Sequence, residues 1–391
     1  MKYSDITKLK HLAQDKKSRS ANPAVVRNST IFFKSMQELF KQEILVKRGS
    51  KVNFYEYGRG GSQTSIALQN FIAELEGAHA TFLTSTGFAS VALAIISICR
   101  PGDEILVTDA VYGPTRVITS KFLKEFKIKA NFYNPEEFKS FQSKLNKKTK
   151  MIFVENPGSN TFEFQDLSRI IKIAKKRKII TAIDNTWGTP LFIKPLKLGF
   201  DMSISSGTKY FSGHSDVMLG SLSVSKRVYD KVRACNKLLG YRVSPDDAYL
   251  VLRGLRTLDI RLKKHEENTK KIINFLKKQN KIKEILYPHK KGTQNYENWR
   301  KYYSGATGLF SIFIYSNNKN SVIKFINSLK LFGIGQSWGG FESLVLYQSH
   351  TIQRVFKKYI KPNHHIVRFH IGLEDPNDLI SDLKQALKKI K

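Results

Sequence analysis

Short apolar runs that alternate with helix-like segments constrain this chain more than any other feature of its sequence. Four of these runs lie at residues 104–108, 151–154, 179–184 and 202–204. A strand that is apolar on both faces must be covered on both sides, which is typical of a mostly parallel sheet flanked by helices. The pattern therefore predicts an α/β fold, with ligands bound beyond the carboxyl ends of the strands. Asp184, Glu155 and the turn at residues 85–87 should face one crevice there.

The pattern of polar and apolar residues changes twice along the chain. Residues 1–56 are polar and irregular, with a turn signal at Asn22-Pro23, so we expect an extended arm. Residues 57–245 carry the alternating strands and helices and are expected to form a large domain. The remaining residues, 246–391, predict a smaller α+β domain. Its expected helices lie within 246–278 and 322–329, and its expected strands at 308–315 and 367–371.

The high positive charge suggests a polyanion partner at first sight, because Lys and Arg neutralise phosphates. The formal net charge is +34, but 49 of the 66 basic residues are Lys and only 17 are Arg. Direct base readout favours Arg, and no zinc-finger, helix-turn-helix or RNP pattern accompanies the lysines. We therefore interpret the charge as a lysine-rich surface and expect no specific nucleic-acid partner.

Cysteine content and hydropathy exclude several other classes of protein. Two cysteines cannot build a disulfide framework, and no Cys/His cluster has metal-site spacing, so no metal is expected. The longest apolar run, residues 88–99, is shorter than the ~20 residues that a bilayer span needs. The first residues lack the apolar core of a secretory signal. These observations together favour a cytoplasmic protein without a membrane segment.

Lys209 is the residue that most suggests chemistry. It follows a short strand and lies among the hydroxyl residues Ser206 and Thr208. A lysine whose ammonium is destabilised can form a Schiff base with a carbonyl group, and hydroxyls beside it can bind phosphate. Taken alone, an exposed loop lysine would explain the same pattern.

Three other short motifs are ambiguous when each is taken alone. Asp184 ends a buried strand and could serve a ligand or cap a helix. Ser85-Thr-Gly87 lies between a strand and a helix, where backbone amides bind anions, but such turns are common. Tyr57-Gly-Arg59 offers a guanidinium for phosphate, or a turn with a solvated arginine.

The order of these motifs is more specific than any one of them. Tyr57-Gly-Arg59, Ser85-Thr-Gly87, Tyr112-Gly, Ile183-Asp-Asn-Thr-Trp187 and Thr208-Lys-Tyr-Phe-Ser-Gly-His214 follow one another along the chain. Arg253-Gly-Leu-Arg-Thr257, Gly339-Gly-Phe-Glu-Ser343 and Arg368-Phe-His-Ile-Gly372 continue the series. In this order the sequence resembles the Cys/Met-metabolism family of fold-type I pyridoxal-phosphate enzymes, from about residue 57 to residue 375.

The resemblance implies a role for each matching residue. Lys209 matches the lysine that binds pyridoxal 5'-phosphate and moves protons, with Tyr112 and Tyr57 as further catalytic residues. The cofactor-binding set implied by the resemblance is Asp184 at the ring nitrogen, Tyr112 on the ring, the amides of Gly87 and Phe88, the hydroxyls of Ser206 and Thr208, and Tyr57 and Arg59 from a neighbouring subunit. The implied substrate-binding set is Arg368 for the α-carboxylate, with Ser337, Trp338 and Asn156. A homodimer at minimum, and a homotetramer as the expected assembly, follow from the shared site.

Within the family, Trp338 favours the bacterial β-lyase pattern, because γ-lyases and γ-synthases usually have a leucine-like residue there. The expected activity is therefore cleavage of the amino acid L-cystathionine to homocysteine, pyruvate and ammonia, a step toward methionine. Weak racemisation of alanine is a further hypothesis. A γ-lyase or γ-synthase is the alternative in the same family, and a polyanion-binding protein on a retired enzyme scaffold is the alternative outside it. Phe88 is bulkier than the usual residue at its position, although its expected contact is through the backbone alone.

Overall fold

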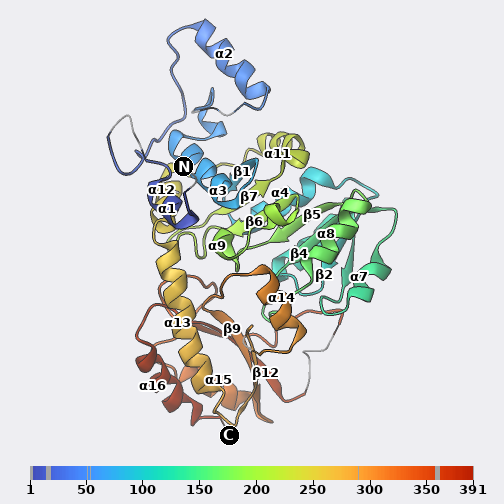
Figure 1. The fold of residues 1–391 in the computed structure, drawn as a ribbon, viewed down its shortest axis with the longest axis vertical. Helices are drawn as coiled ribbons and strands as arrows, with labels where there is room; N and C mark the ends of the chain where they lie inside the picture. Colours follow the sequence, from blue (N-terminus) through green and yellow to red (C-terminus); the bar gives the residue numbers. More distant parts are fainter. Residues whose placement is uncertain are drawn as a thin grey trace.

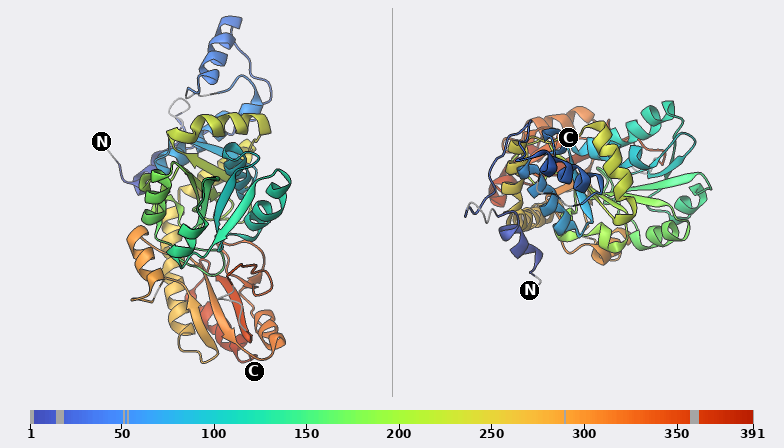
Figure 2. Two further views of the ribbon diagram at one scale, coloured as in Figure 1. Left: turned by 90° about the vertical axis from the view of Figure 1, so that its right-hand side faces the viewer. Right: turned by 90° about the horizontal axis from the view of Figure 1, so that it is seen from above.

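The computed structural model describes residues 3–14, 19–50, 52, 54–288, 290–356 and 362–390. Two sheets organise the described chain, one of seven strands and one of five (Figure 1). The seven-stranded sheet lies in the middle of the molecule, and the five-stranded sheet lies toward the carboxyl terminus (Figure 2).

The seven-stranded sheet has the order β1-β7-β6-β5-β4-β2-β3. Its strands are β1 (Ala80–Thr84), β2 (Glu104–Thr108), β3 (Lys129–Tyr133), β4 (Thr149–Glu155), β5 (Ile180–Asp184), β6 (Met202–Ser206) and β7 (Gly220–Val224). The pairs from β6 to β3 are parallel, whereas β7 runs antiparallel to both of its neighbours, β1 and β6. The predicted α/β fold with a mostly parallel sheet is confirmed.

Helices cover both faces of this sheet, as its apolar strands require. The apolar residues of α4 (Gly87–Ile98) and α11 (Lys226–Leu239) pack with one set of strand side chains, and those of α8 (Leu167–Lys176) pack with the opposite set. α3 (Gln63–Glu76) packs beside β1 and against α12 (Pro245–Leu255). Shorter helices connect the strands: α5 (Gly113–Val117), α6 (Leu123–Glu125), α7 (Phe138–Lys144), α9 (Thr189–Phe192) and α10 (Pro195–Leu198).

The helical segment between β2 and β3, residues 113–125, is divided into three pieces. It consists of α5, a π-helical turn η2 (Ile118–Phe122) and α6. The hydroxyl of Thr119 donates to the carbonyl of Thr115, and that of Ser120 donates to the carbonyl of Arg116, each at 2.7 Å. Such bonds to the preceding turn compete with the backbone ladder and loosen it. The backbone therefore changes from α-helical to π-helical between α5 and η2.

The five-stranded sheet has the order β10-β11-β12-β9-β8 and is antiparallel except for the pair β10–β11. Its strands are β8 (Ile282–Leu286), β9 (Leu309–Tyr315), β10 (Gly333–Ile334), β11 (Leu344–Tyr347) and β12 (His364–His370). The helices of this region are α13 (Leu258–Leu276), α14 (Gln294–Tyr302), α15 (Lys319–Asn327) and α16 (Pro376–Leu387). The long α13 runs past α12 toward this sheet and packs against α16 (Figure 1).

The amino-terminal residues lie apart from both sheets. α1 (Asp5–His11) is anchored to the body by the fully buried Leu9 and by an ion pair between Lys10 and Asp259 at 2.6 Å. α2 (Met36–Lys47) projects from the end of the molecule opposite the five-stranded sheet, and the turn η1 (Gly58–Gly60) follows (Figures 1 and 2). Among the described residues, no helix combines the length and the hydropathy needed to cross a bilayer.

Candidate functional site

The candidate site lies where the carboxyl ends of β1, β4, β5 and β6 meet. In the register of the sheet, Glu155 at the end of β4 is paired with Asp184 at the end of β5. The turn that follows β1 reaches the end of β6, because a Cβ atom added to Gly87 would lie 2.6 Å from Cβ of Ser206. These three segments therefore meet at one edge of the sheet, and the crevice expected there remains a prediction.

The amino-terminal end of α4 forms an anion cradle. The side chain of Thr86 caps the helix by accepting from the amide of Ala89 at 3.0 Å, and the carbonyl of Thr86 accepts from the amide of Ser90. The amides of Gly87 and Phe88 precede these bonds and belong to the helix end, where N–H groups have no intrahelical partner. Glycine at residue 87 lets the start of α4 lie close to the end of β6, since any side chain at this position would collide with Ser206.

Lys209 lies three residues after Ser206, the last residue of β6, in the turn that follows this strand. Its Nζ donates a hydrogen bond to Oγ of Ser337 at 2.6 Å and lies 5.7 Å from the ring centroid of Trp338. Burial and the positive charge of Arg368 lower the pKa of Lys209 to about 8. A lysine amine whose pKa is close to neutral pH is suited to carbonyl chemistry and to proton transfer.

The two hydroxyl residues beside Lys209 differ in their contacts. The hydroxyl of Thr208 donates to the carbonyl of Leu219 at 3.2 Å and accepts from the amide of Leu219 at 2.9 Å. Ser206 lies against Gly87 at the mouth of the cradle. Ser206 therefore lies beside the start of α4, whereas Thr208 ties the Lys209 turn to Leu219, the residue before β7.

Two neighbouring carboxyl groups form the floor of the site. Asp184 accepts from the amide of Thr186 at 3.0 Å and from its hydroxyl at 2.6 Å, yet burial raises the pKa of Asp184. Burial, with the charge of Asp184, raises the pKa of Glu155 well above its usual range, although Glu155 accepts from the amide of Tyr112 at 2.6 Å. A cationic group bound beside these carboxylates would stabilise their ionised form.

Tyr112 is the aromatic residue above this floor. It is the N-cap residue of α5, and its side chain is 47% exposed. Burial of the hydroxyl and the nearby charges of Glu155 and Asp184 raise the pKa of Tyr112, while Arg368 opposes the rise. The hydroxyl of Tyr112 is therefore within electrostatic reach of both carboxyl groups and of the guanidinium of Arg368.

Arg368 comes from β12 of the other sheet and closes the opposite side. Its Nη2 donates to the carbonyl of Ser337 at 3.2 Å, and its Nη1 donates to Oδ1 of Asn160 at 3.5 Å. Burial lowers the pKa of Arg368 to about 10. Of the residues expected at the substrate, Arg368, Ser337 and Trp338 are brought together with Lys209.

Two asparagines on the loop after β4 have different roles. Asn156, expected near the substrate, donates through Nδ2 to the hydroxyl of Tyr303 at 2.9 Å and accepts at Oδ1 from the amide of Gln165 at 2.7 Å. The structure thus places Asn156 as a buried support behind the site. Asn160 is the asparagine that contacts Arg368, with a positive φ of 63°. Sequence reasoning missed Asn160, and its one local signal was an Asn within a turn-like Gly-Ser-Asn segment.

Tyr57 and Arg59 are not part of this cluster within one chain. Both are exposed, Tyr57 by 50%, and neither bonds to Lys209, Asp184 or Arg368 among the described residues. Their predicted role in a neighbouring subunit's site remains a prediction.

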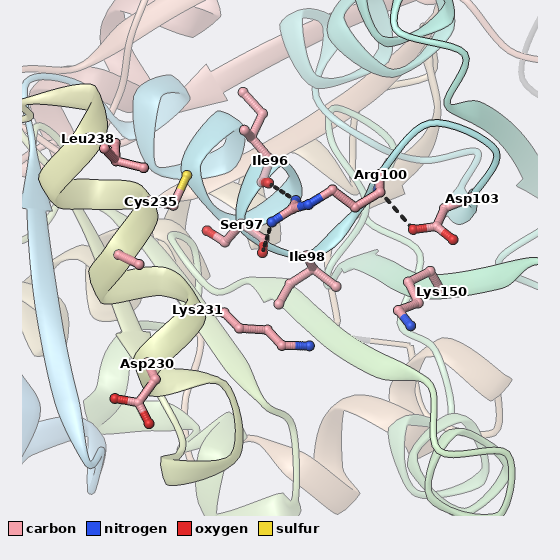
Figure 3. Close-up of a pocket in the computed structure, with 11 residues that line it drawn as sticks. Ile96, Ser97, Ile98, Arg100, Asp103, Lys150, Asp230, Lys231, Cys235 and Leu238 are labelled. Carbon is pink, nitrogen blue, oxygen red and sulfur yellow. Dashed lines mark hydrogen bonds between the residues drawn. The ribbon is translucent and has the colours of Figure 1, made fainter.

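Two hollows in the surface differ in their relation to the site. One, of about 420 Å³, is lined by Phe88, Pro114, Asn160 and Arg354 and so borders the cradle and the Arg368 side of the site. A wider one, of about 870 Å³, lies between α4 and α11 and is lined by Arg100, Lys231, Leu238 and their neighbours (Figure 3). None of the predicted site residues lines this second hollow, so its size does not indicate the place of the chemistry.

Pyridoxal 5'-phosphate fits the residues that the structure gathers. Its phosphate matches the cradle in front of α4, and its aldehyde matches the partly neutralised amine of Lys209. Its protonated ring nitrogen matches the carboxylate floor, because burial raises the pKa of Asp184 and a cationic group bound beside it would favour its ionised form. The three chemical features of the cofactor thus meet three suitable groups.

Comparison with known proteins identifies relatives over nearly the whole chain. The family described as Cys/Met metabolism PLP-dependent enzyme matches residues 7–388. A cystathionine beta-lyase from Haemophilus influenzae is 35% identical over 396 residues, which cover 100% of this chain and 99% of that protein. An L-alanine/L-glutamate racemase from Wolbachia pipientis wMel is 33% identical over 386 residues, or 95% of this chain and 93% of that protein.

A solved structure agrees with these similarities. Cystathionine gamma synthase from Xanthomonas oryzae pv. oryzae, crystallised with aminoacrylate and cysteine, has a TM-score of 0.90 against this chain. The similarity covers 100% of this chain and 99% of that one, at 27% sequence identity. The fold is therefore shared by relatives with different named activities.

Proposed function

Because this chain belongs to the Cys/Met metabolism PLP-dependent enzyme family, we propose that it is a carbon–sulfur β-lyase that cleaves L-cystathionine. Its cofactor is pyridoxal 5'-phosphate, as for the family. The proposed reaction takes cystathionine and water to homocysteine, pyruvate and ammonia. The observation that carries the choice of β-elimination is the position of Trp338, whose ring centroid lies 5.7 Å from Nζ of Lys209. The full-length similarity to a β-lyase supports the same choice.

Lys209 is the proposed proton carrier. The bound cofactor supplies an electron sink for the charge that develops at the substrate Cα when its proton is removed. Lys209 can accept that proton near neutral pH because burial has lowered the pKa of its amine to about 8. The hydrogen bond to Ser337 fixes the direction of Nζ, so that the amine faces the substrate position from one side.

The cofactor is held by groups at three points in this proposal. The amides of Gly87 and Phe88 and the hydroxyl of Ser206 bind the phosphate, with Thr208 as a further hydroxyl whose bonds to Leu219 must adjust. Asp184 provides the counter-charge for the protonated ring nitrogen. The ring of Tyr112 covers the remaining face.

Arg368 is the proposed clamp for the substrate α-carboxylate. A guanidinium can donate two parallel hydrogen bonds to a carboxylate, and the low exposure of Arg368 strengthens such a pair. Its present bonds to Ser337 and Asn160 hold the guanidinium in place before the substrate arrives. The 420 Å³ hollow beside Asn160 offers space for the part of the substrate beyond its sulfur.

Trp338 supports β-elimination rather than γ-elimination because its ring limits the movement of the Lys209 amine. β-Elimination requires Lys209 to remove one proton, from Cα, whereas γ-elimination also requires proton transfer at Cβ and a wider swing of the amine. Trp338 packs against Tyr210, with ring centroids 5.4 Å apart, and it stands beside Nζ of Lys209. A large ring held there restricts the swing that the longer elimination needs.

The amino-terminal residues support a shared active site between two copies of the chain. The helix α2 stands away from the body and exposes apolar side chains at a spacing of four residues, Met36, Phe40 and Ile44. Exposed apolar side chains in such a stripe mark an interaction surface. We propose that residues 1–56 form an arm that contacts a second copy, and that Tyr57 and Arg59 complete the phosphate site of that copy.

Product analysis with L-cystathionine tests the proposed reaction. Pyruvate with homocysteine is the expected result, and it identifies cleavage on the Cβ side of sulfur. Formation of 2-oxobutyrate with cysteine would instead assign γ-elimination and refute the β-lyase proposal.

Racemisation of alanine is a second candidate activity, favoured by the full-length similarity to an L-alanine/L-glutamate racemase. Removal of the Cα proton is common to both reactions, and alanine has no group at Cβ that can leave. Return of a proton to the opposite face of Cα would then give D-alanine. Incubation of L-alanine with the holoenzyme and chiral analysis of the products tests this candidate, which fails if no D-alanine forms.

A further inference from the structure

The turn at residues 337–340, which contacts Lys209, has a strained backbone conformation. Ser337 has a φ of 104°, which is rarely adopted by a residue with a side chain. Gly339 has a φ of 89°, and a Cβ atom there would lie 2.9 Å from the amide nitrogen of Tyr210 and 3.1 Å from Cα of Lys209. The turn is therefore pressed against the backbone of Lys209, and surrounding groups must hold it there.

Two residues of β12 hold this turn from two sides. Arg368 donates to the carbonyl of Ser337 at 3.2 Å, on the side of the substrate. His370 contacts the rear of the turn, where its Nε2 lies 3.1 Å from both the amide nitrogen of Gly339 and the carbonyl oxygen of Gly340. Because Arg368 and His370 are two residues apart on one strand, they lie on the same face of the sheet.

His370 is buried and neutral. Its side chain is 1% exposed, and burial together with the charges of His265, Arg368 and Lys209 lowers its pKa well below the usual range. A neutral imidazole can use Nε2 either to accept from the Gly339 amide or to donate to the Gly340 carbonyl. In either tautomer the ring is bonded to the turn, whereas Nδ1 has no hydrogen-bond partner among the described residues.

We propose that His370 is a positioning residue for the reaction: by its Nε2 hydrogen bond to the Ser337–Gly340 turn it fixes Ser337 against the amine of Lys209. The proposal rests on the proposed function only in taking Lys209 as the proton carrier. The family similarity assigns no role to this histidine. The structure supplies the connection, since one strand holds the turn at both ends and the turn holds Nζ of Lys209 at 2.6 Å.

A pair of amide substitutions separates the two ring nitrogens. His370→Gln keeps a polar group near the position of Nε2, and His370→Asn keeps one near the position of Nδ1, where the native ring has no described partner. We expect the Gln variant to retain near-native behaviour and the Asn variant to lose about tenfold in kcat, the effect of one broken hydrogen bond. Equal behaviour of the two variants would overturn the proposal, because packing alone would then explain His370.

A labelling experiment provides a readout that requires no turnover. The full chain is stripped of cofactor and labelled with acetic anhydride across a pH series, and the Lys209 peptide is quantified by mass spectrometry. The native midpoint is expected near pH 8. In His370→Asn the loosened turn admits water to Nζ, so the midpoint should move upward toward that of a free lysine amine. An unchanged midpoint would overturn the proposal even if cystathionine proves not to be the substrate.

Two further variants complete the test. If His370 acts on kcat through Ser337, adding His370→Asn to Ser337→Ala should not lower kcat further. If the two substitutions instead lower kcat by independent factors that multiply, His370 does not act through Ser337. His265→Asn is the matched control, since the ring centroid of His265 lies 5.1 Å from that of His370 in a tilted arrangement, while its Nδ1 bonds to the carbonyl of Ile371 and not to the turn. Should His370→Asn fold poorly, as judged by its Tm, His370→Ser serves in its place with the same expectations.

Discussion

Replacing Lys209 with Met should stabilise the cofactor-free chain while abolishing turnover. The pKa of Lys209 is lowered from 10.5 to about 8, mainly by burial. One pKa unit corresponds to ~1.4 kcal/mol, so holding the charged amine in the fold costs about 3 kcal/mol at neutral pH. The side chain keeps some access to solvent, and the substitution removes its hydrogen bond to Ser337. The expected net gain for Lys209→Met at pH 7 is therefore about 2 kcal/mol.

The pH dependence of this gain has a definite sign. The folded-state pKa of Lys209 lies below its unfolded value, so the unfolded chain binds the extra proton between about pH 8 and pH 10.5. The stability of the native sequence rises with pH across that window, and the Met variant lacks this contribution. By pH 9.5 the advantage of the variant should fall by about 2 kcal/mol, almost to zero.

Urea unfolding of the two cofactor-free chains at pH 7 and pH 9.5 measures both values. Lys209→Gln provides a polar control of similar length that also lacks the charge, and its gain should show the same dependence on pH. A gain that is the same at both pH values, or no gain at pH 7, would refute the reasoning from a buried ammonium.

Further predictions concern the cofactor and the substrate. Lys209→Ala should have no measurable cystathionine turnover and yet retain noncovalent pyridoxal 5'-phosphate, as equilibrium dialysis can show. Asp184→Ala should fold normally by circular dichroism but turn over slowly, because the ring nitrogen loses its counter-charge; an unchanged rate would assign that task to another acid. Arg59→Ala chains mixed with Lys209→Ala chains should regain activity on subunit exchange, and no recovery after verified exchange would place Arg59 in its own chain's site. Arg368→Lys should lower kcat/KM by roughly tenfold to a hundredfold with little change in cofactor absorbance, since lysine lacks the planar fork; a bleached cofactor with an unchanged KM would contradict its assignment as the carboxylate clamp.

The parts of the fold that could be predicted from the sequence are those fixed by local patterns. β2 has the predicted bounds because an apolar run buried on both faces needs no partner to be recognised. β7 was missed because its residues, Gly220–Val224, alternate Ser with apolar side chains and contain a glycine. Its place between β1 and β6 depends on pairing with residues about 140 positions away on one side and about 20 on the other, as with Ser223 and Thr81. No local window contains that information.

The residues of the candidate site also differ in how far the sequence alone could predict them. Asp184, Gly87 and Lys209 could be proposed from the sequence because each stands at the end of a strand or within three residues of it, where a topological rule places ligands. Asn160 and His370 were not assigned a role, because what they do depends on contacts with residues far away in the sequence. Asn160 reaches Arg368 across 208 positions, and His370 reaches Gly339 across 31. The contact between Asn160 and Arg368 becomes visible only when the second sheet is placed against the first, and that between His370 and Gly339 only when β12 is placed beside the turn that precedes β11.

Phe88 shows why an unusual residue at a binding site need not alter the chemistry there. Its contribution to the anion cradle is the backbone amide at the start of α4, which any residue other than proline supplies. Its side chain is 40% exposed and lines the 420 Å³ hollow beside Pro114 and Asn160 instead of the cradle. Gly87, by contrast, has no such freedom, since a Cβ atom there would lie 2.7 Å from Oγ of Ser206. A change at Phe88 should therefore alter the preference among substrates, whereas a change at Gly87 should weaken cofactor binding itself.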